Sequence, residues 1–178
     1  MAEATNNSIT EILKDKTIRA KGKVSSISQL VIDSKVSIQQ LIGSAIIEND
    51  TNKANIIEAL EFVSKIKTDI INKQGFEFAI ESLKSDAPRV KWESARVIAN
   101  TAHLFPKLLK KAVVNLLNNT EHPGTVVRWS AAGALSKIIQ CKTDLNKELM
   151  PAIKAIEKRE VDNAIKKIYK QGLKKAAT

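Results

Sequence analysis

The chain has 178 residues, of which 43% are hydrophobic, 27% charged and 4% aromatic, a composition typical of a folded domain able to bury a core. The scarcity of aromatic residues, with 6 glycines and 4 prolines, argues against an all-β sandwich or barrel, which needs many short strands and tight turns. The net charge of +10 favours an acidic partner: nucleic acid, an anionic membrane surface or an acidic protein.

Helical periodicity runs through most of the chain, and no stretch alternates apolar and polar residues as a half-buried strand does. Ser37 and Gln40 have the spacing of a capping box, and Pro88 suits the first turn of a helix. The stretch 20–28 is polar and contains glycine, so the segment before it is expected to be an arm or a short helix. The predicted helices, in chain order, span 9–20, 26–34, 37–48, 53–67, 73–85, 88–104, 107–119, 125–141, 145–157 and 160–175.

Several classes of site are disfavoured by the residue inventory. The single cysteine, Cys141, leaves no disulfide framework, and only two histidines, His103 and His122, are available as metal ligands. No phosphate-binding glycine loop or catalytic triad pattern is present, so we expect no metal, no cofactor and no enzymatic activity. No apolar run approaches the ~20 residues of a membrane span, and a cytoplasmic location is the default expectation.

An internal repeat organises the second half of the chain. Val90, Trp92 and Ala95 recur 37 residues later as Val127, Trp129 and Ala132. In both copies a helix precedes the segment, and the connecting turn contains a proline. A two-helix unit recurring at this length is typical of a helical solenoid, in which stacked units bury a continuous core.

The repeated segment resembles the second helix of HEAT repeats. The resemblance is carried by Val127, Arg128, Ala131, Ala132, Ala134 and Leu135, with a weaker copy at Val90, Lys91, Ala95 and Ile98. Lys91 stands where the family usually has arginine. The resemblance implies an all-α fold: a right-handed α-solenoid of about four HEAT-like helix pairs, an armadillo-like superhelix with a polar N-terminal extension. We therefore expect an N-terminal arm or short helix at 1–24 and a single solenoid domain at 25–178.

Candidate binding residues follow from the helical wheel of the repeated helices. Val90, Ala95, Ile98 and Ala102, like Val127, Ala132, Leu135 and Ile139, point into the stack. In HEAT-like proteins the second helices line the concave surface, so the opposite side would be a partner-binding groove. The candidates on and beside it are Trp92, Glu93, Arg96, Asn100, Arg128, Trp129 and Lys137.

Each candidate also has a structural interpretation. The two tryptophans are either binding anchors or pack between neighbouring repeats. Arg96 is expected to pair with Glu93 within its helix rather than to hold an anion. Arg128 begins a helix, where a cation is disfavoured, and is expected to contact the preceding turn.

Two further features have simple expected explanations. Gly133 interrupts a helix at a cost of ~1 kcal/mol relative to alanine, and close packing against a neighbouring helix would explain it; space for a ligand backbone is the alternative. Glu58 and Glu61 form a pair of carboxylates one turn apart, and we expect them to lie on a solvated face.

The last predicted helix is strongly basic. Lys166, Lys167, Lys170 and Lys174 lie together on its polar side and form a possible anion-binding patch. A solvated outer face of a terminal repeat is the simpler interpretation.

Two functions are carried forward from the sequence. The first is a non-enzymatic scaffold whose concave face recognises a protein or peptide. The alternative is a nucleic-acid-binding HEAT-like protein related to alkylated-base DNA glycosylases, in which Glu93 would have to act as the catalytic carboxylate. The oligomeric state is not determined by the sequence.

Overall fold

The computed structural model describes the backbone of residues 2–177 and the side chains of residues 8–177. Within this part of the chain ten α-helices are joined by short turns and three 3₁₀ segments. The helices are α1 (Ala2–Lys14), α2 (Ala20–Ile32), α3 (Ile38–Ile47), α4 (Asp50–Ile66), α5 (Lys73–Ser82), α6 (Pro88–Thr101), α7 (Leu109–Asn119), α8 (Thr125–Gln140), α9 (Asn146–Arg159) and α10 (Asn163–Ala177). The 3₁₀ segments are η1 (Thr68–Ile70), η2 (Ala102–Leu104) and η3 (Pro106–Leu108).

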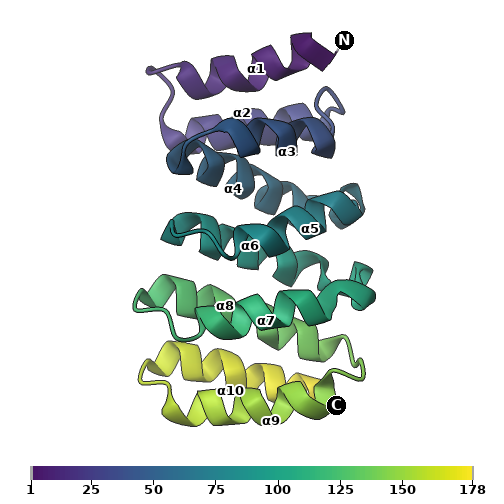
Figure 1. Ribbon diagram of the computed structural model, residues 1–178, viewed down its shortest axis with the longest axis vertical. Coiled ribbons are helices and arrows are strands. Elements are labelled where there is room, and N and C mark those ends of the chain that lie inside the picture. Colours follow the sequence, from purple (N-terminus) through teal and green to yellow (C-terminus); the bar gives the residue numbers. More distant parts are fainter. Residues whose placement is uncertain (1, 178) are drawn as a thin grey trace.

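Consecutive helices form pairs that stack in chain order, so that the termini lie at opposite ends of an elongated molecule (Figure 1). The second helix of each pair packs on the second helix of the next: α2 contacts α4, α4 contacts α6, α6 contacts α8, and α8 contacts α10. The first helices α1, α3, α5 and α7 likewise contact one another in sequence. One row of second helices therefore runs the length of the described chain, as a solenoid requires.

Local sequence signals explain where several helices begin. Ser37 caps α3 in a reciprocal capping box with Gln40, as predicted from their spacing. Asn49 and Asn72 accept hydrogen bonds from backbone N–H groups in the first turns of α4 and α5. Pro88 occupies the first turn of α6, where its missing N–H leaves no hydrogen bond unmade.

The core is built from the residues that the repeat predicted to face inward. The core-facing residues of both copies each expose no more than 2% of their surface: Val90, Ala95, Ile98, Ala102, Val127, Ala132, Leu135 and Ile139. Alanines at these positions allow neighbouring second helices to approach closely, while the valine, isoleucine and leucine side chains fill the space between layers. The same side of each second helix thus contributes to one continuous apolar core.

The N-terminal region differs from the sequence prediction. The helices expected at 9–20 and 26–34 are α1 and α2, both beginning earlier in the chain, and the boundary expected after residue 24 falls inside α2. Ile9, with 0% of its surface exposed, and Leu13, with 3%, pack α1 into the core. The segment 20–28 is polar in composition, yet one side of α2 is buried in the core. Ser28 lies on that buried side, where its hydroxyl donates a hydrogen bond to the Val24 carbonyl oxygen. The structure consequently has five helix pairs in its described residues rather than about four.

None of the helices in residues 2–177 combines the length and the apolar character needed to cross a membrane.

Candidate functional site

The solvent-facing side of the second helices, here called the second-helix face, contains most of the predicted binding residues. Its residues recur every three or four positions, opposite those buried in the core. The second-helix face comprises Glu58, Phe62 and Lys65 of α4; Arg89, Trp92, Arg96, Asn100 and His103 of α6 and η2; and Val126, Trp129, Gly133, Lys137 and Gln140 of α8.

Aromatic side chains lie on three successive second helices. Trp92 is half-buried, and its indole N–H donates a hydrogen bond of 2.7 Å to Glu93 Oε1. Trp129 leaves 46% of its surface exposed, and its indole N–H has no partner among the described residues. Phe62, also 46% exposed, was not singled out from the sequence because α4 matches the repeat too weakly to fix its register. The two tryptophans therefore differ: Trp92 is held by the fold, while Trp129 is open to a ligand.

Arg96 is part of a charged network between α6 and α4. Its guanidinium lies 2.9 Å from Glu93 Oε2, as expected, and also 3.1 Å from Glu61 Oε1 of the preceding second helix. Asn100 extends the network by donating to Ser64 Oγ at 2.8 Å. The expectation of a solvated Glu61 is wrong, because only 4% of its side chain is exposed. This guanidinium is occupied by protein carboxylates and is a poor candidate for binding an anion.

Glu93 is buried between these groups. Burial raises the pKa of its carboxyl above the ordinary value, although the hydrogen bond from Trp92 and the charge of Arg96 act in the opposite direction. The carboxylate of Glu58 lies nearer the solvent and pairs with Arg89 of α6. Glu58 on the second-helix face and the buried Glu61 and Glu93 beneath it are thus all paired with arginine.

The structure places Arg128 away from the second-helix face. Its Nε lies 3.1 Å from Oε2 of Glu160, the residue that follows α9, and its Nη1 donates to the carbonyl oxygens of His122 and Pro123 at 3.0 Å. Lys91, its counterpart one repeat earlier, donates to the Leu83 carbonyl oxygen at 3.2 Å. The predicted contact with the preceding turn is therefore present at both positions, and Arg128 belongs to the junction between repeats.

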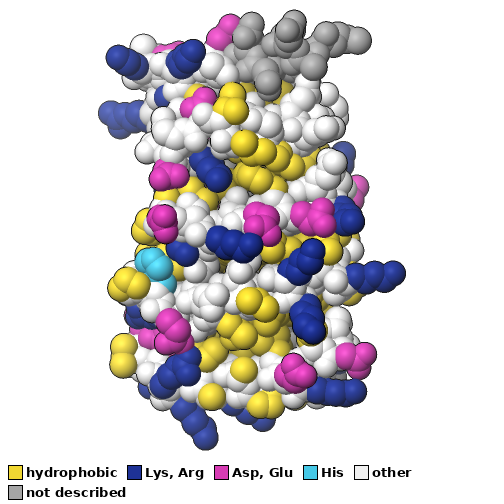
Figure 2. Space-filling view, in the orientation of Figure 1, with side chains coloured by type: hydrophobic (Ala, Val, Ile, Leu, Met, Phe, Trp, Pro, Cys, Tyr) yellow, Lys and Arg dark blue, Asp and Glu magenta, His cyan; other side chains and the backbone are white. Residues whose placement is uncertain are grey.

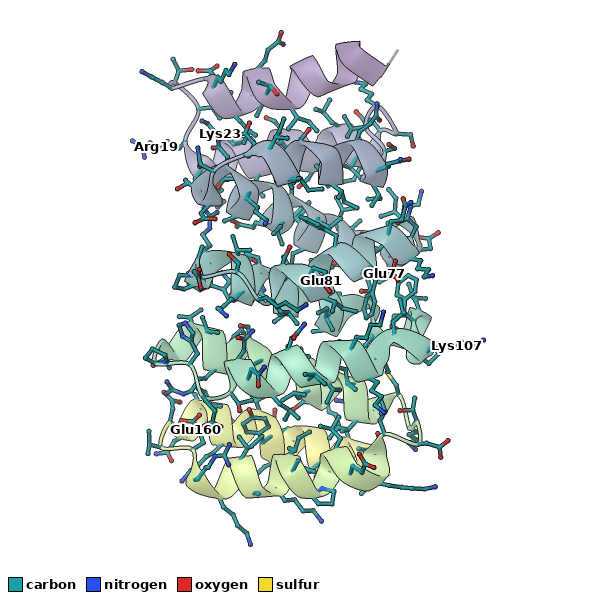
Figure 3. All side chains as sticks on the ribbon, in the orientation of Figure 1. Arg19, Lys23, Glu77, Glu81, Lys107 and Glu160 are labelled. Atoms are coloured by element: carbon teal, nitrogen blue, oxygen red, sulfur yellow. The ribbon has the colours of Figure 1, made fainter. Side chains whose placement is uncertain are left out.

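Glu160 is the acidic partner in that junction (Figure 3). Although burial acts to raise the pKa of its carboxyl, hydrogen bonds from the Asp162 N–H, Arg128 and the Val161 N–H together lower it. This arrangement holds α10 against α8 at the end where both helices begin.

Gly133 lies in open space on the second-helix face. A Cβ atom built there would meet nothing within 4 Å, so the expected close packing against a neighbouring helix is wrong. The contrast is Gly172 of α10, where a Cβ would come within 2.5 Å of the Ser136 side chain and 3.0 Å of its Cα. Gly172 is required by helix packing, whereas the fold gives no packing reason for Gly133.

A pocket of about 380 Å³ lies where α4, α6 and α8 end. Three basic side chains from successive repeats line it: Lys65, His103 and Lys137. Its other lining residues are Ser64, Thr68, Ala99, Asn100, Ala102, Gln140 and Cys141, none of them acidic. Burial raises the pKa of the Cys141 thiol, so the thiol form is favoured over the thiolate. The pocket suits a small anionic group better than it suits nucleophilic chemistry.

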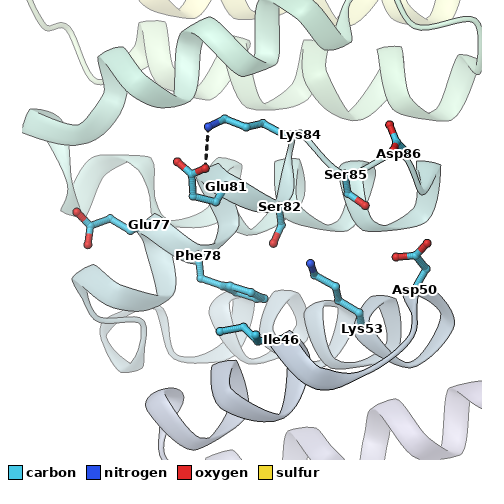
Figure 4. A pocket seen from close by; sticks show the side chains of 10 residues that line it. All are labelled: Ile46, Asp50, Lys53, Glu77, Phe78, Glu81, Ser82, Lys84, Ser85 and Asp86. Atoms are coloured by element: carbon cyan, nitrogen blue, oxygen red, sulfur yellow. Dashed lines mark hydrogen bonds and ion pairs between the residues drawn. The ribbon is translucent and has the colours of Figure 1, made fainter.

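A second hollow, of about 720 Å³, lies between α3, α4 and α5 (Figure 4). Four carboxylates and two ammonium groups line it, from Asp50, Glu77, Glu81, Asp86, Lys53 and Lys84. Lys84 lies 2.7 Å from Glu81, and the Lys53 ammonium lies 5.9 Å from the Phe78 ring centre. On this side of the stack acidic and basic side chains are interspersed over the middle helices (Figure 2). Acidic residues thus outnumber basic ones in this hollow, whereas the pocket on the second-helix face is lined by basic residues and by no acidic ones.

The predicted lysine patch lies on α10. Ile165, Tyr169 and Gly172 bury the opposite side of this helix in the fold. Lys167 and Lys174 are exposed, Lys166 is half-buried, and Lys170 lies 3.6 Å from Glu157 of α9. The four lysines share the side of the helix that is turned away from the core, and a role in anion binding stays a prediction.

Among the side chains described, no group of three or more histidine, cysteine, aspartate or glutamate residues is arranged to hold a metal ion.

Comparison with known proteins identifies the architecture. No protein-family model matches the sequence, and no curated protein does. The complex of CpcE and CpcF of phycocyanin lyase from Nostoc sp. PCC7120 contains a chain similar to this one with a TM-score of 0.73 and 18% identity, covering 97% of this chain and 99% of that one. The fold is that of HEAT/armadillo-like helical repeat proteins.

Designed proteins share the HEAT/armadillo-like fold as well. A designed armadillo repeat protein in complex with the peptide (KR)4 has a TM-score of 0.71 at 15% identity, covering 99% of this chain and 82% of that one. Another designed armadillo repeat protein gives the same TM-score of 0.71 at 15% identity, with 94% of this chain covered and 80% of that one. At such identities the likeness concerns the fold alone.

Proposed function

We propose that this chain is a HEAT/armadillo-like scaffold that binds a protein or peptide along its second-helix face. The observation that carries the proposal is that Trp129 and Gly133 lie one turn apart on the same side of α8. Trp129 is exposed, and its indole N–H has no partner among the described residues, while Gly133 lies in open space. Tryptophan is among the side chains most enriched at binding hot spots. A ligand backbone can approach α8 closely where glycine replaces a side chain.

The energetics of α8 support the same interpretation. A glycine inside a helix costs roughly 0.5–1 kcal/mol relative to alanine, and an exposed indole forgoes the benefit of burial. The cost of the glycine is not offset by packing, because nothing lies within 4 Å of a Cβ at Gly133, and Trp129 leaves 46% of its surface exposed. Binding a partner would bury Trp129 and would use the space above Gly133.

The solved relatives support a binding role without deciding it. One is a designed armadillo repeat protein in complex with a peptide, and another is a chain from a complex of two different proteins. Because the latter complex is a phycocyanin lyase, the fold by itself is compatible with an enzyme. The non-enzymatic role is therefore part of our proposal, based on the arginine-paired carboxylates of the second-helix face.

Nothing in the structure or in these relatives supports the DNA glycosylase alternative. Arg96, the guanidinium that would hold a phosphate, is occupied by Glu61 and Glu93. Glu93, the carboxylate that would have to act on the sugar, is buried and accepts hydrogen bonds from Trp92 and Arg96.

The proposal is tested by selecting short random peptides, displayed on phage, against the immobilised protein. We expect selected peptides to lose about tenfold or more in affinity with Trp129→Ala, as hot-spot side chains do. Val114→Ala on α7 is the matched control, because Val114 is 56% exposed on a first helix. Failure to select any peptide, or equal losses for the two variants, would contradict the proposal.

A further inference from the structure

We propose that the occupant of the second-helix face is an acidic, extended segment of a protein, an inference that rests on the proposed function and adds the chemistry of the partner. The first observation is the distribution of charge along the row of second helices. α8 and α10, which pack against each other, contain no aspartate or glutamate. Their basic residues are Arg128, Lys137, Lys166, Lys167, Lys170, Lys174 and Lys175.

The carboxylates elsewhere on this face do not oppose an acidic ligand. Glu58 pairs with Arg89, Glu61 and Glu93 share Arg96, and Glu61 also pairs with Lys65, so these three carboxylates are balanced by three cations. Lys137, by contrast, is exposed and its ammonium has no carboxylate partner among residues 8–177. The unmatched charge of the second-helix face is therefore positive and is centred on the end of α8.

The pocket at the end of α8 is the place where an acidic group would be held. Lys65, His103 and Lys137 reach it from three successive repeats, and no acidic residue lines it. Its volume of about 380 Å³ leaves room for a carboxylate side chain. Lys65 also lies 2.8 Å from Glu61, so Lys137 is the main cation available to a ligand.

The spacing along α8 sets the form of the ligand. Trp129, Gly133 and Lys137 are each one turn apart on the same side of the helix. A rise of 1.5 Å per residue puts the first and the last about 12 Å apart, which an extended chain covers in roughly three to four residues. The ligand would place an apolar side chain on Trp129, pass its backbone over Gly133, and set a carboxylate beside Lys137 about three or four residues away.

An acidic protein segment fits this face better than nucleic acid does. Nucleic acid is held by repeated contacts to phosphates, for which arginine and lysine supply the cations. Both arginines of the second-helix face are already paired with glutamates of α4 and α6. An apolar anchor and one carboxylate site, as found here, are the pattern of a short peptide motif.

The test uses three fluorescein-labelled probes and measures anisotropy at low and at physiological salt. The first is a glycine- and serine-rich peptide containing one leucine followed by glutamates three and four positions later. The second replaces the glutamates with lysines, and the third is an oligothymidylate of equal negative charge. We expect the glutamate peptide alone to bind well, to bind less tightly as salt rises, and to lose at least tenfold in affinity with Lys137→Glu.

Lys154→Glu provides the matched control, since Lys154 is an exposed lysine of the first helix α9 and the variant has the same net charge as Lys137→Glu. The inference is overturned if the glutamate peptide does not bind, if the lysine peptide or the oligothymidylate binds more tightly, or if the two charge-reversal variants weaken binding equally. Phage-selected peptides that depend on Trp129 but are not acidic would overturn this inference while leaving the proposed function intact.

Discussion

Helices α6 and α8 have the same repeated pattern, yet the side chains that α6 directs away from the core are engaged in contacts while those of α8 are largely free. In α6 three positions on or just beneath the second-helix face hold Glu93, Arg96 and Asn100, and all three are engaged in contacts within α6 or with α4. The positions 37 residues later hold Ser130, Gly133 and Lys137. Of these, Ser130 bonds to its own helix, Gly133 meets open space, and Lys137 is exposed.

The comparison separates two uses of one repeat position. In α6 the charged side chains of this region form ion pairs with α4, and these ion pairs connect two repeats. In α8 the same face has been left free and carries the exposed tryptophan. A repeat architecture permits this division because each unit contacts only its neighbours, so one unit can specialise while the next maintains the stack.

The largest expected effect is the loss of the charged network in α6. Arg96→Ala would remove the cation that pairs with the buried carboxylate of Glu93 and one of the two that pair with Glu61, leaving Lys65 as the other. We expect the free energy of unfolding to fall by about 2–3 kcal/mol, less than for a fully buried pair because one-third of the Arg96 side chain is exposed. Urea denaturation followed by circular dichroism measures the change.

The control for that substitution is Lys137→Ala, which removes an exposed cation of α8 at the repeat position equivalent to Asn100. We expect it to change stability by no more than about 0.5 kcal/mol, as is usual for an exposed side chain without a partner. Equal losses for the two variants would show that the α6 network is not a stabilising element and would remove the distinction between the two helices.

Replacing each of two glycines with alanine tests which side of α8 is packed and which is open. Gly172→Ala would drive a Cβ into Ser136 on the packed side of α8, and we expect a loss of about 1–3 kcal/mol. Gly133→Ala, on the open side, should instead stabilise the protein by roughly 0.5–1 kcal/mol through helix propensity. Thermal and urea unfolding of both variants, with Gly43→Ala as a second open-space glycine, provide the test.

If Gly133→Ala destabilised the protein, an unrecognised packing constraint would exist at this position. Gly133 would then be a residue required by packing and not a position left free for a ligand.

The smallest expected effect is a difference in pH dependence between two glutamates. Burial raises the pKa of Glu93, so the folded protein holds this proton after the unfolded chain has lost it, and the contribution to stability declines as pH rises through the glutamate range. At Glu160 the burial effect is outweighed by hydrogen bonds from Asp162, Arg128 and Val161, and the pKa is lowered. Its contribution is present above the ordinary pKa and is lost as pH falls.

Urea denaturation from about pH 3 to pH 7, a range that extends to both sides of the ordinary glutamate pKa of about 4.3, measures both contributions. Relative to the unsubstituted protein, Glu93→Gln should gain stability as pH rises and Glu160→Gln should lose it. Parallel curves for the two variants would contradict the assigned environments.

Much of the architecture could be predicted from the sequence. The spacing of Ser37 and Gln40 located the start of α3, and the recurrence of Val90 and Trp92 at Val127 and Trp129 indicated stacked helix pairs. The N-terminal pair was predicted poorly because the buried Ser28 interrupts the apolar stripe of α2. A hydroxyl that bonds to its own helix can be buried at little cost, so composition alone concealed the fifth pair.

The candidate site was predicted only in part. Periodicity placed Trp92, Arg96, Trp129 and Lys137 on one face, but it could not distinguish the half-buried tryptophan from the exposed one. Arg128 was included in the site, although its partner Glu160 lies in the next repeat. Phe62 was missed because α4 is too divergent a copy of the repeat.

The sequence by itself determined most of the helices, the pairing of those in the repeated region and the side of each that faces the core, since these depend on spacings of three and four residues within one segment. Only the tertiary structure decided which outward residues are free. That outcome depends on what the neighbouring repeat brings within reach: Glu61 for Arg96, Glu160 for Arg128, and nothing for Gly133. Stacking sets these contacts between segments distant in sequence, and helical periodicity carries no information about them.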